Sequence, residues 1–149
     1  AKGRTDFVRI AALAEGGLVS LATLNDESAP YFENIVLGSS ADTLDDGEAA
    51  SIAHALTLDA RAIIDERKAN RICASRFPQL RMGCTVDLLA HPAVQHSLGS
   101  SVLAEATYQA LKTARMRVLP DQVEWVIQLI GADRAASCPC LSSSVRRAA

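Results

Sequence analysis

The sequence predicts an all-α fold, a small bundle of five to seven helices, on the strength of two observations. Gly and Pro residues divide the 149-residue chain into segments of helix length, which consist mostly of Ala, Leu, Ile, Glu, Arg and Gln. Pro lacks a backbone N–H and Gly lacks a side chain, so both end helices, whereas the residues between them lose little rotamer freedom in a helix. In addition, apolar residues in the longer segments recur every three or four positions, which is the period of an α-helix.

The N-terminal part is expected to contain two helices. The first covers residues 5–15 and ends at Gly16-Gly17, and the second is a short helix over residues 31–37. Glycine ends helices readily because it adopts the left-handed backbone that follows the last turn. The segment between them, residues 18–24, has the sequence LVSLATL. So short a pattern fits both a strand and a short buried helix, and it does not distinguish them.

The longest helix is expected over residues 45–75. Asp45 and Glu48 form a capping pattern at its start, in which two side chains satisfy free backbone N–H groups. The pattern also allows a break in this helix near Thr57. The apolar positions that give this stretch its helical period are Ile52, Leu56, Ala60 and Ile63.

Three further helices are expected, over residues 80–90, 101–118 and 120–130. Pro and Gly residues separate them, and the last one begins with a second Asp-x-x-Glu capping signal. The residues that follow are small and polar. The chain is therefore expected to divide into a single helical domain, residues 1–137, and a C-terminal tail, residues 138–149.

Composition and charge exclude several classes of function. The net charge is −2, from 15 basic and 17 acidic residues, which argues against a nucleic-acid-binding surface because such a surface needs a cationic excess. The sequence has no apolar run of about 18 residues, so no transmembrane segment is expected. Charged residues interrupt the only early apolar run, so no signal peptide is expected either.

The four cysteines are interpreted as reduced, buried thiols. A chain of this size and apolar content does not need disulfides, and reduced thiols place the protein in an intracellular reducing compartment. Paired Cys-x-x-Cys steps, which zinc sites commonly use, are absent from the sequence, so no metal is expected. The cysteines are Cys73, Cys84, Cys138 and Cys140.

Two charged groupings are interpreted as structural. On a helix over residues 80–90, Cys84 and His91 would lie about 10 Å apart along the axis, too far for a nucleophile and its base. Asp87 is instead expected to pair with His91. Arg61 and Asp65, four positions apart, are expected to form a solvated ion pair on the long helix.

Two parts of the chain resemble known families. Residues 18–37, LVSLATLNDESAPYFENIVL, are similar to the opening hairpin of split-barrel flavin-binding proteins. Residues 78–144 resemble the all-helical carboxymuconolactone decarboxylase and alkylhydroperoxidase-D-like group, through AHPAV, then LPDQVEW, then Cys-Pro-Cys. The second resemblance implies a redox protein whose thiols are Cys138 and Cys140. In this chain Cys-x-Cys replaces the family's Cys-x-x-Cys, and no His follows it.

The function favoured by these observations is that of a soluble, non-catalytic helical subunit packing into a larger protein assembly or a homo-oligomer. The helix over residues 120–130 is apolar on two sides, more than one core contact needs. Aromatic residues are only 4% of the chain, so the core is thin and a partner would complete it. No catalytic, cofactor-binding or metal-binding residue is assigned and no cofactor is expected; whether the chain is an enzyme, or a small-ligand binding module, stays open. The residues assigned to the protein interface are Val123, Trp125, Ile127 and Leu129.

Overall fold

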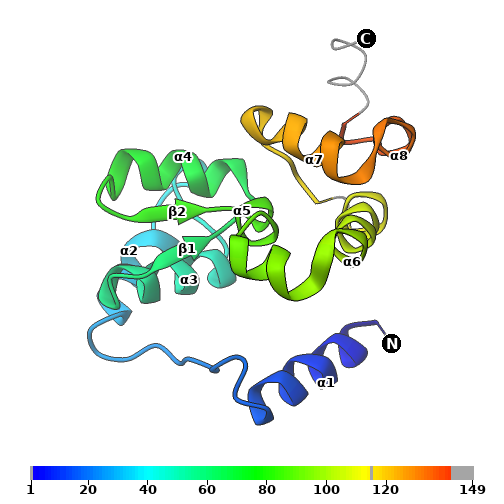
Figure 1. Cartoon of the computed structure of the whole chain (residues 1–149). Helices are drawn as coiled ribbons and strands as arrows, with labels where there is room; N and C mark the ends of the chain where they lie inside the picture. The colour runs from blue at the N-terminus through cyan, green and yellow to red at the C-terminus, as the bar shows by residue number, and fades with distance from the viewer. Residues whose placement is uncertain (1, 115, 142–149) are drawn as a thin grey trace.

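The computed structural model describes residues 2–114 and 116–141 (Figure 1). This part of the chain is 61% helical and holds eight α-helices, one short 3-10 helix and two strands. In chain order, the elements are α1 (Lys2–Glu15), α2 (Ala29–Val36), α3 (Asp46–Thr57), β1 (Arg61–Ile63), α4 (Arg67–Arg76), β2 (Arg81–Gly83), α5 (Thr85–Leu89), α6 (Pro92–Thr113), η1 (Pro120–Gln122), α7 (Val123–Ile130) and α8 (Ala132–Ala136).

The structure corrects the all-α expectation. It is mostly helical, as predicted, but β1 and β2 form a two-stranded parallel sheet in which Arg61 pairs with Arg81 and Ile63 with Gly83. Helix α4 connects the two strands, so β1, α4 and β2 form a βαβ unit. Each strand is only three residues long, too short to show the two-residue period that distinguishes a strand from a helix. The expected bundle of five to seven helices is therefore wrong for the described residues.

The long helix expected over residues 45–75 is three elements, α3, β1 and α4. Its start is as predicted, because the Asp45 side chain accepts a hydrogen bond of 2.9 Å from the backbone N–H of Glu48. The helix then ends at Thr57, where the sequence pattern allowed a break. Asp59 has a φ of 46°, in the left-handed region that Asp tolerates better than most residues, and this turn redirects the chain into β1.

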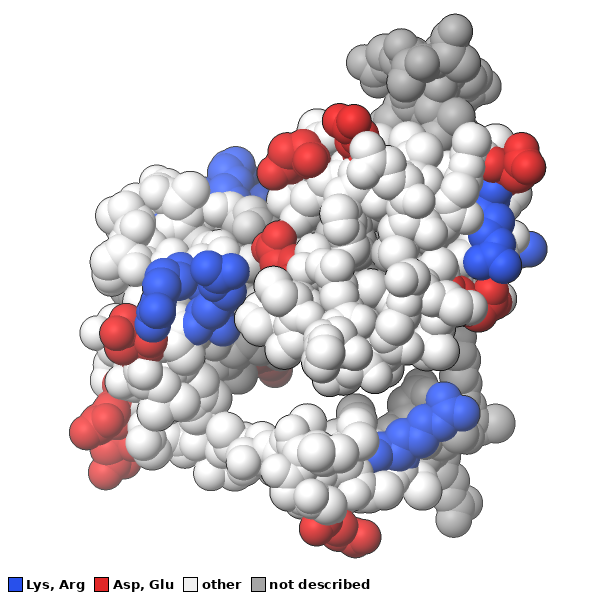
Figure 2. Space-filling model, in the orientation of Figure 1, with Lys and Arg blue, Asp and Glu red and all other residues white. Residues whose placement is uncertain are grey.

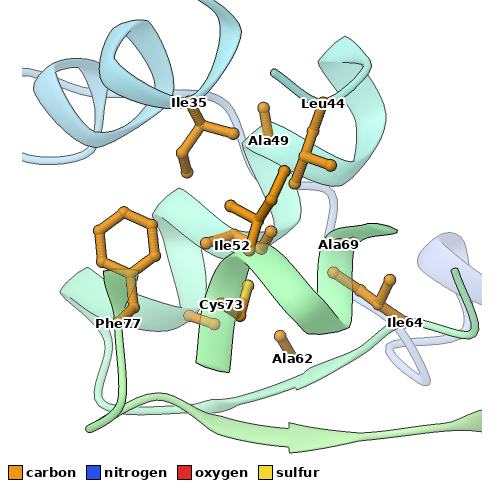
Figure 3. Close-up of a cluster of buried hydrophobic side chains, with 11 residues drawn as sticks. Ile35, Leu44, Ala49, Ile52, Ala62, Ile64, Ala69, Cys73 and Phe77 are labelled. Atoms are coloured by element: carbon orange, nitrogen blue, oxygen red, sulfur yellow. The ribbon is translucent and has the colours of Figure 1, made fainter. Parts of the chain in front are cut away.

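A first buried cluster holds the sheet against α2, α3 and α4. Figure 1 shows α4 above the strands and α3 below them. In Figure 3 the side chains of these elements converge on Ile52, which is fully buried. The cluster consists of Ile35, Leu44, Ala49, Ile52, Ala55, Ala62, Ile64, Ala69, Ile72, Cys73 and Phe77.

A second buried cluster joins α5, α6, α7 and α8. The expected helix over residues 80–90 is β2 followed by α5, and Gly99, with a φ of 71°, interrupts α6. Cys138 and Leu141 are fully buried in this cluster. The division at residue 138 stays a prediction, and residues 142–149 lie outside the described part of the chain.

The N-terminal segment is separate from both clusters. Figure 1 shows α1 apart from the other helices, joined to α2 by an extended stretch of chain. Within that stretch residues 20–25 are neither helix nor strand, and Leu18 and Leu21 are exposed. None of the helices in the described residues combines the length and apolar composition that crossing a membrane requires.

Candidate active site

An aspartate lies directly beyond the carboxyl end of the sheet. Asp65 follows β1 by two residues, and Thr85 begins α5 just after β2. The Thr85 backbone N–H donates to Asp65 Oδ1 at 2.8 Å, and the Thr85 hydroxyl donates to Asp65 Oδ2 at 2.7 Å. Both carboxylate oxygens are therefore fixed in orientation. The carboxyl ends of parallel strands are where open α/β folds place their ligands.

Three more carboxylates gather where α3 and α4 begin. Asp45 precedes α3, Glu48 lies in its first turn, and Glu66 precedes α4. Partial burial raises the pKa of Glu48, and the negative charges of Asp45 and Glu66 raise it further. Lys68 and a hydrogen bond at Asp45 act in the opposite direction without reversing the shift. Like charges held together near a half-buried carboxylate are typical of functional sites.

Basic side chains of α4 anchor the loop beside this acidic group. Lys68 Nζ donates to the Ser40 carbonyl at 2.7 Å, and Arg71 donates to the Ala41 carbonyl at 3.0 Å. On the other side of the sheet end, Arg117 donates to the Asp65 carbonyl at 3.3 Å. The acidic residues thus lie on a framework of side-chain to backbone hydrogen bonds.

The carboxylates do not form a metal centre by themselves. In residues 2–114 and 116–141, no group of three or more His, Cys, Asp or Glu side chains could hold a metal ion. Both oxygens of Asp65 accept hydrogen bonds from Thr85. The donor set of the described residues does not fit a metal.

Sequence reasoning missed this site. It assigned Glu48 only to capping and Asp65 only to an ion pair with Arg61, which the structure does not form because those residues lie on a strand and a loop. The signal available was the acidic pair Asp65-Glu66 directly after the apolar run of residues 62–64. A short apolar run followed by acidic residues is typical of a buried parallel strand whose carboxyl end lies at a functional site.

The expected pair between Asp87 and His91 is also wrong. Asp87 Oδ2 accepts from the Cys84 backbone N–H at 2.9 Å, and its Oδ1 accepts from Gln122 Nε2 at 2.7 Å. His91 instead begins α6, where its Nδ1 accepts from the Ala93 backbone N–H at 3.2 Å. These contacts hold α5 to the segment before α7, so they are structural.

The residues assigned to a protein interface all lie on α7, away from the acidic group. Helix α7 contacts both α6 and α8, which explains why it is apolar on two sides. Their role as an interface stays a prediction. Val123, Trp125, Ile127 and Leu129 are all partly buried against the second cluster.

The four cysteines are free thiols in the structure. Cys73, Cys84 and Cys138 are buried, and Cys140 is exposed. Although Cys140 is exposed as a residue, partial desolvation of its thiol and the neighbouring Cys138 raise its pKa, which is the opposite of what a reactive thiolate needs.

Comparison with known proteins decides between the functional hypotheses. A family model described as a PIN domain matches residues 6–132. No curated protein and no solved structure matches the chain. The match overturns the non-catalytic helical subunit, and equally the decarboxylase-like redox protein with Cys138 and Cys140, because the PIN fold is α/β and nuclease-like. With most of its length covered by that family model, the chain belongs to the PIN domain family.

Proposed function

We propose that this chain is a nuclease domain that hydrolyses phosphodiester bonds of RNA beside the carboxyl end of β1. The nuclease-like character of PIN domains, which often bind RNA, supports the reaction class and the substrate. One observation carries the location: Glu48, a half-buried carboxylate, has a pKa raised by burial and by the charges of Asp45 and Glu66. Glu66 directly follows Asp65, whose carboxylate is fixed by Thr85.

Glu48 is the general base in this proposal. A carboxylate with a raised pKa is a stronger base than an ordinary one, so it removes a proton from water more effectively near neutral pH. The water oxygen bonds to phosphorus, the bond to the leaving oxygen breaks, and solvent returns a proton to that oxygen. The ammonium group of Lys68, close enough to lower the pKa of Glu48, offsets the negative charge that develops on the phosphate oxygens.

Asp65 is a positioning residue. Its two hydrogen bonds to Thr85 join the end of β1 to the start of α5, and so fix the backbone from which Glu66 and α4 follow. Residues that hold a site in register act through geometry, and a displacement of about 1 Å costs roughly 100-fold in rate.

Nucleic acid as the partner replaces the expectation drawn from net charge. That expectation concerned the whole chain, whereas binding depends on where the charges gather. A protein partner or a second copy on Val123, Trp125, Ile127 and Leu129, and an intracellular reducing compartment, remain separate proposals. The exposed Cys140, two residues from Cys138, is consistent with such a compartment.

The test is cleavage of a 5′-labelled single-stranded oligoribonucleotide by purified full-length chain. Glu48→Gln keeps the shape and removes the base, so the cleavage rate should fall by roughly 100-fold or more. Glu124→Gln, an exposed substitution on α7, is the matched control and should leave the rate unchanged. Equal rates for wild type and Glu48→Gln would refute the proposal.

A further inference from the structure

Two arginines stand side by side at the beginning of the sheet. Arg61 is the first residue of β1 and Arg81 the first of β2, and they are register partners in the parallel pair. Both are exposed. Partners in a parallel register point to the same face. Figure 2 shows basic side chains next to one another in the left half of the molecule, where Figure 1 places the strands, with acidic side chains beside them.

One acidic residue, Asp59, contacts this pair, because Arg81 Nη2 donates to the Asp59 backbone carbonyl. Arg81 Nη2 lies 3.4 Å from Asp59 Oδ1, but the Asp59 side chain is 98% exposed and Arg81 is 57% exposed. Such exposed ion pairs contribute little. Within the described residues the Arg61 side chain has no ion pair and no hydrogen bond. Like charges directly opposite one another destabilise a sheet unless something compensates them.

The Arg61 side chain runs along the sheet toward the acidic end. A β-carbon added at Gly83 would lie 3.1 Å from Arg61 Cδ and 3.2 Å from Asp87 Oδ2. Gly83 pairs with Ile63, two residues further along β1 than Arg61. The stem of Arg61 therefore covers the sheet where glycine leaves room, and Asp87 nearby already accepts hydrogen bonds at both oxygens.

We propose that Arg61 and Arg81 bind phosphates of a single-stranded RNA and lead the strand along the sheet face to Glu48 and Asp65. This proposal rests on the proposed nuclease function, because it names the surface that holds the same substrate. The guanidinium fork matches phosphate geometry and is always charged. Register partners on neighbouring strands lie about 5 Å apart, so the guanidinium groups of Arg61 and Arg81 can both reach phosphates of one RNA strand.

The test measures binding separately from cleavage. Fluorescence anisotropy of a labelled single-stranded oligoribonucleotide is recorded in EDTA at increasing salt, with the full-length chain. Each phosphate contact contributes about 0.7 to the slope of log affinity against log salt. Arg61→Gln with Arg81→Gln should therefore flatten the slope by about 1.4 and weaken binding several-fold at low salt.

The matched control removes two charges elsewhere. Arg9→Gln with Arg134→Gln changes exposed arginines on α1 and α8 and should leave the slope unchanged. Arg61→Lys with Arg81→Lys keeps the charges, so it should restore the slope and show that the Gln variants did not lose binding by misfolding.

Three results would overturn the inference: an unchanged slope in the Arg61 and Arg81 Gln variant, an equal change in the control, or an equal loss of affinity for an RNA duplex of the same sequence. The proposed function fails independently. If Glu48→Gln cleaves like wild type while the arginine variant loses binding, the nuclease site is wrong and the phosphate surface stands. If Glu48→Gln stops cleavage and the arginine variant binds normally, the nuclease site stands and the phosphate surface is wrong.

Discussion

Thr85 holds both oxygens of Asp65, one through its backbone N–H and one through its hydroxyl. This pair joins the end of the first strand to the helix that follows the second. It connects residues that lie twenty positions apart in the sequence and fixes the carboxyl edge of the sheet.

Thr85→Ala should lower both stability and cleavage. It removes the hydroxyl that donates to Asp65 and leaves the backbone bond in place. A hydrogen bond to a charged group contributes about 1.5–3 kcal/mol, so the free energy of unfolding measured by urea denaturation should fall by about that amount. The cleavage rate should fall by roughly 10-fold or more as Asp65 loses its orientation. Thr85→Ser, which restores the hydroxyl, should recover both; recovery of stability without cleavage would contradict the positioning role.

Glu48→Gln should stabilise the fold at neutral pH. The folded pKa of Glu48 is raised, so the folded state binds this proton more tightly than the unfolded chain. The stabilisation that protonated Glu48 adds to the free energy of unfolding is therefore fully present at low pH, and it is lost as the pH rises through the pKa of the folded state. The variant should melt at a higher temperature than wild type at about pH 7, with the difference closing toward about pH 4. A variant that is less stable at neutral pH would show that burial and the acidic neighbours do not disfavour the ionised form of Glu48.

Gly83→Ala should destabilise the sheet and disturb the arginine surface. The added β-carbon would lie 2.9 Å from Ile63 Cδ1 and 3.1 Å from Arg61 Cδ, so both side chains must move. Overpacking of this kind costs about 1–3 kcal/mol, measurable by thermal unfolding. Gly47→Ala, in a helix with no contact closer than 3.5 Å, is the matched control and should be neutral or stabilising. Equal stability of the two variants would argue against the close approach at Gly83.

Cys140 should react with alkylating reagents before the other three cysteines. It is the exposed one, whereas Cys73 is buried and burial raises its pKa to about 11. Only the thiolate is nucleophilic, so Cys73 should be labelled only after unfolding. Iodoacetamide labelling at about pH 8, followed by mass spectrometry of peptides with and without denaturant, reports the order. Labelling of Cys73 as fast as Cys140 in the folded protein would place that thiol outside the core.

Features that depend on neighbours in the chain can be predicted from the sequence. The capping pattern at Asp45 and Glu48, the helix end at Gly131 and the mostly helical content follow from local backbone preferences, and the structure shows each of them. Local preferences act over three or four residues, which is the range that a sequence pattern reports.

The sheet and the site depend on contacts between residues that lie far apart in the sequence. Residues 61–63 are too few to show a period, and they become a strand because residues 81–83 pair with them across helix α4. That pairing carries Asp65 to Thr85 and places Arg61 beside Arg81. Hydrogen bonds between distant strands leave no local mark in the sequence, so the contact of Asp65 with Thr85 and the pairing of Arg61 with Arg81 are seen only in the folded chain.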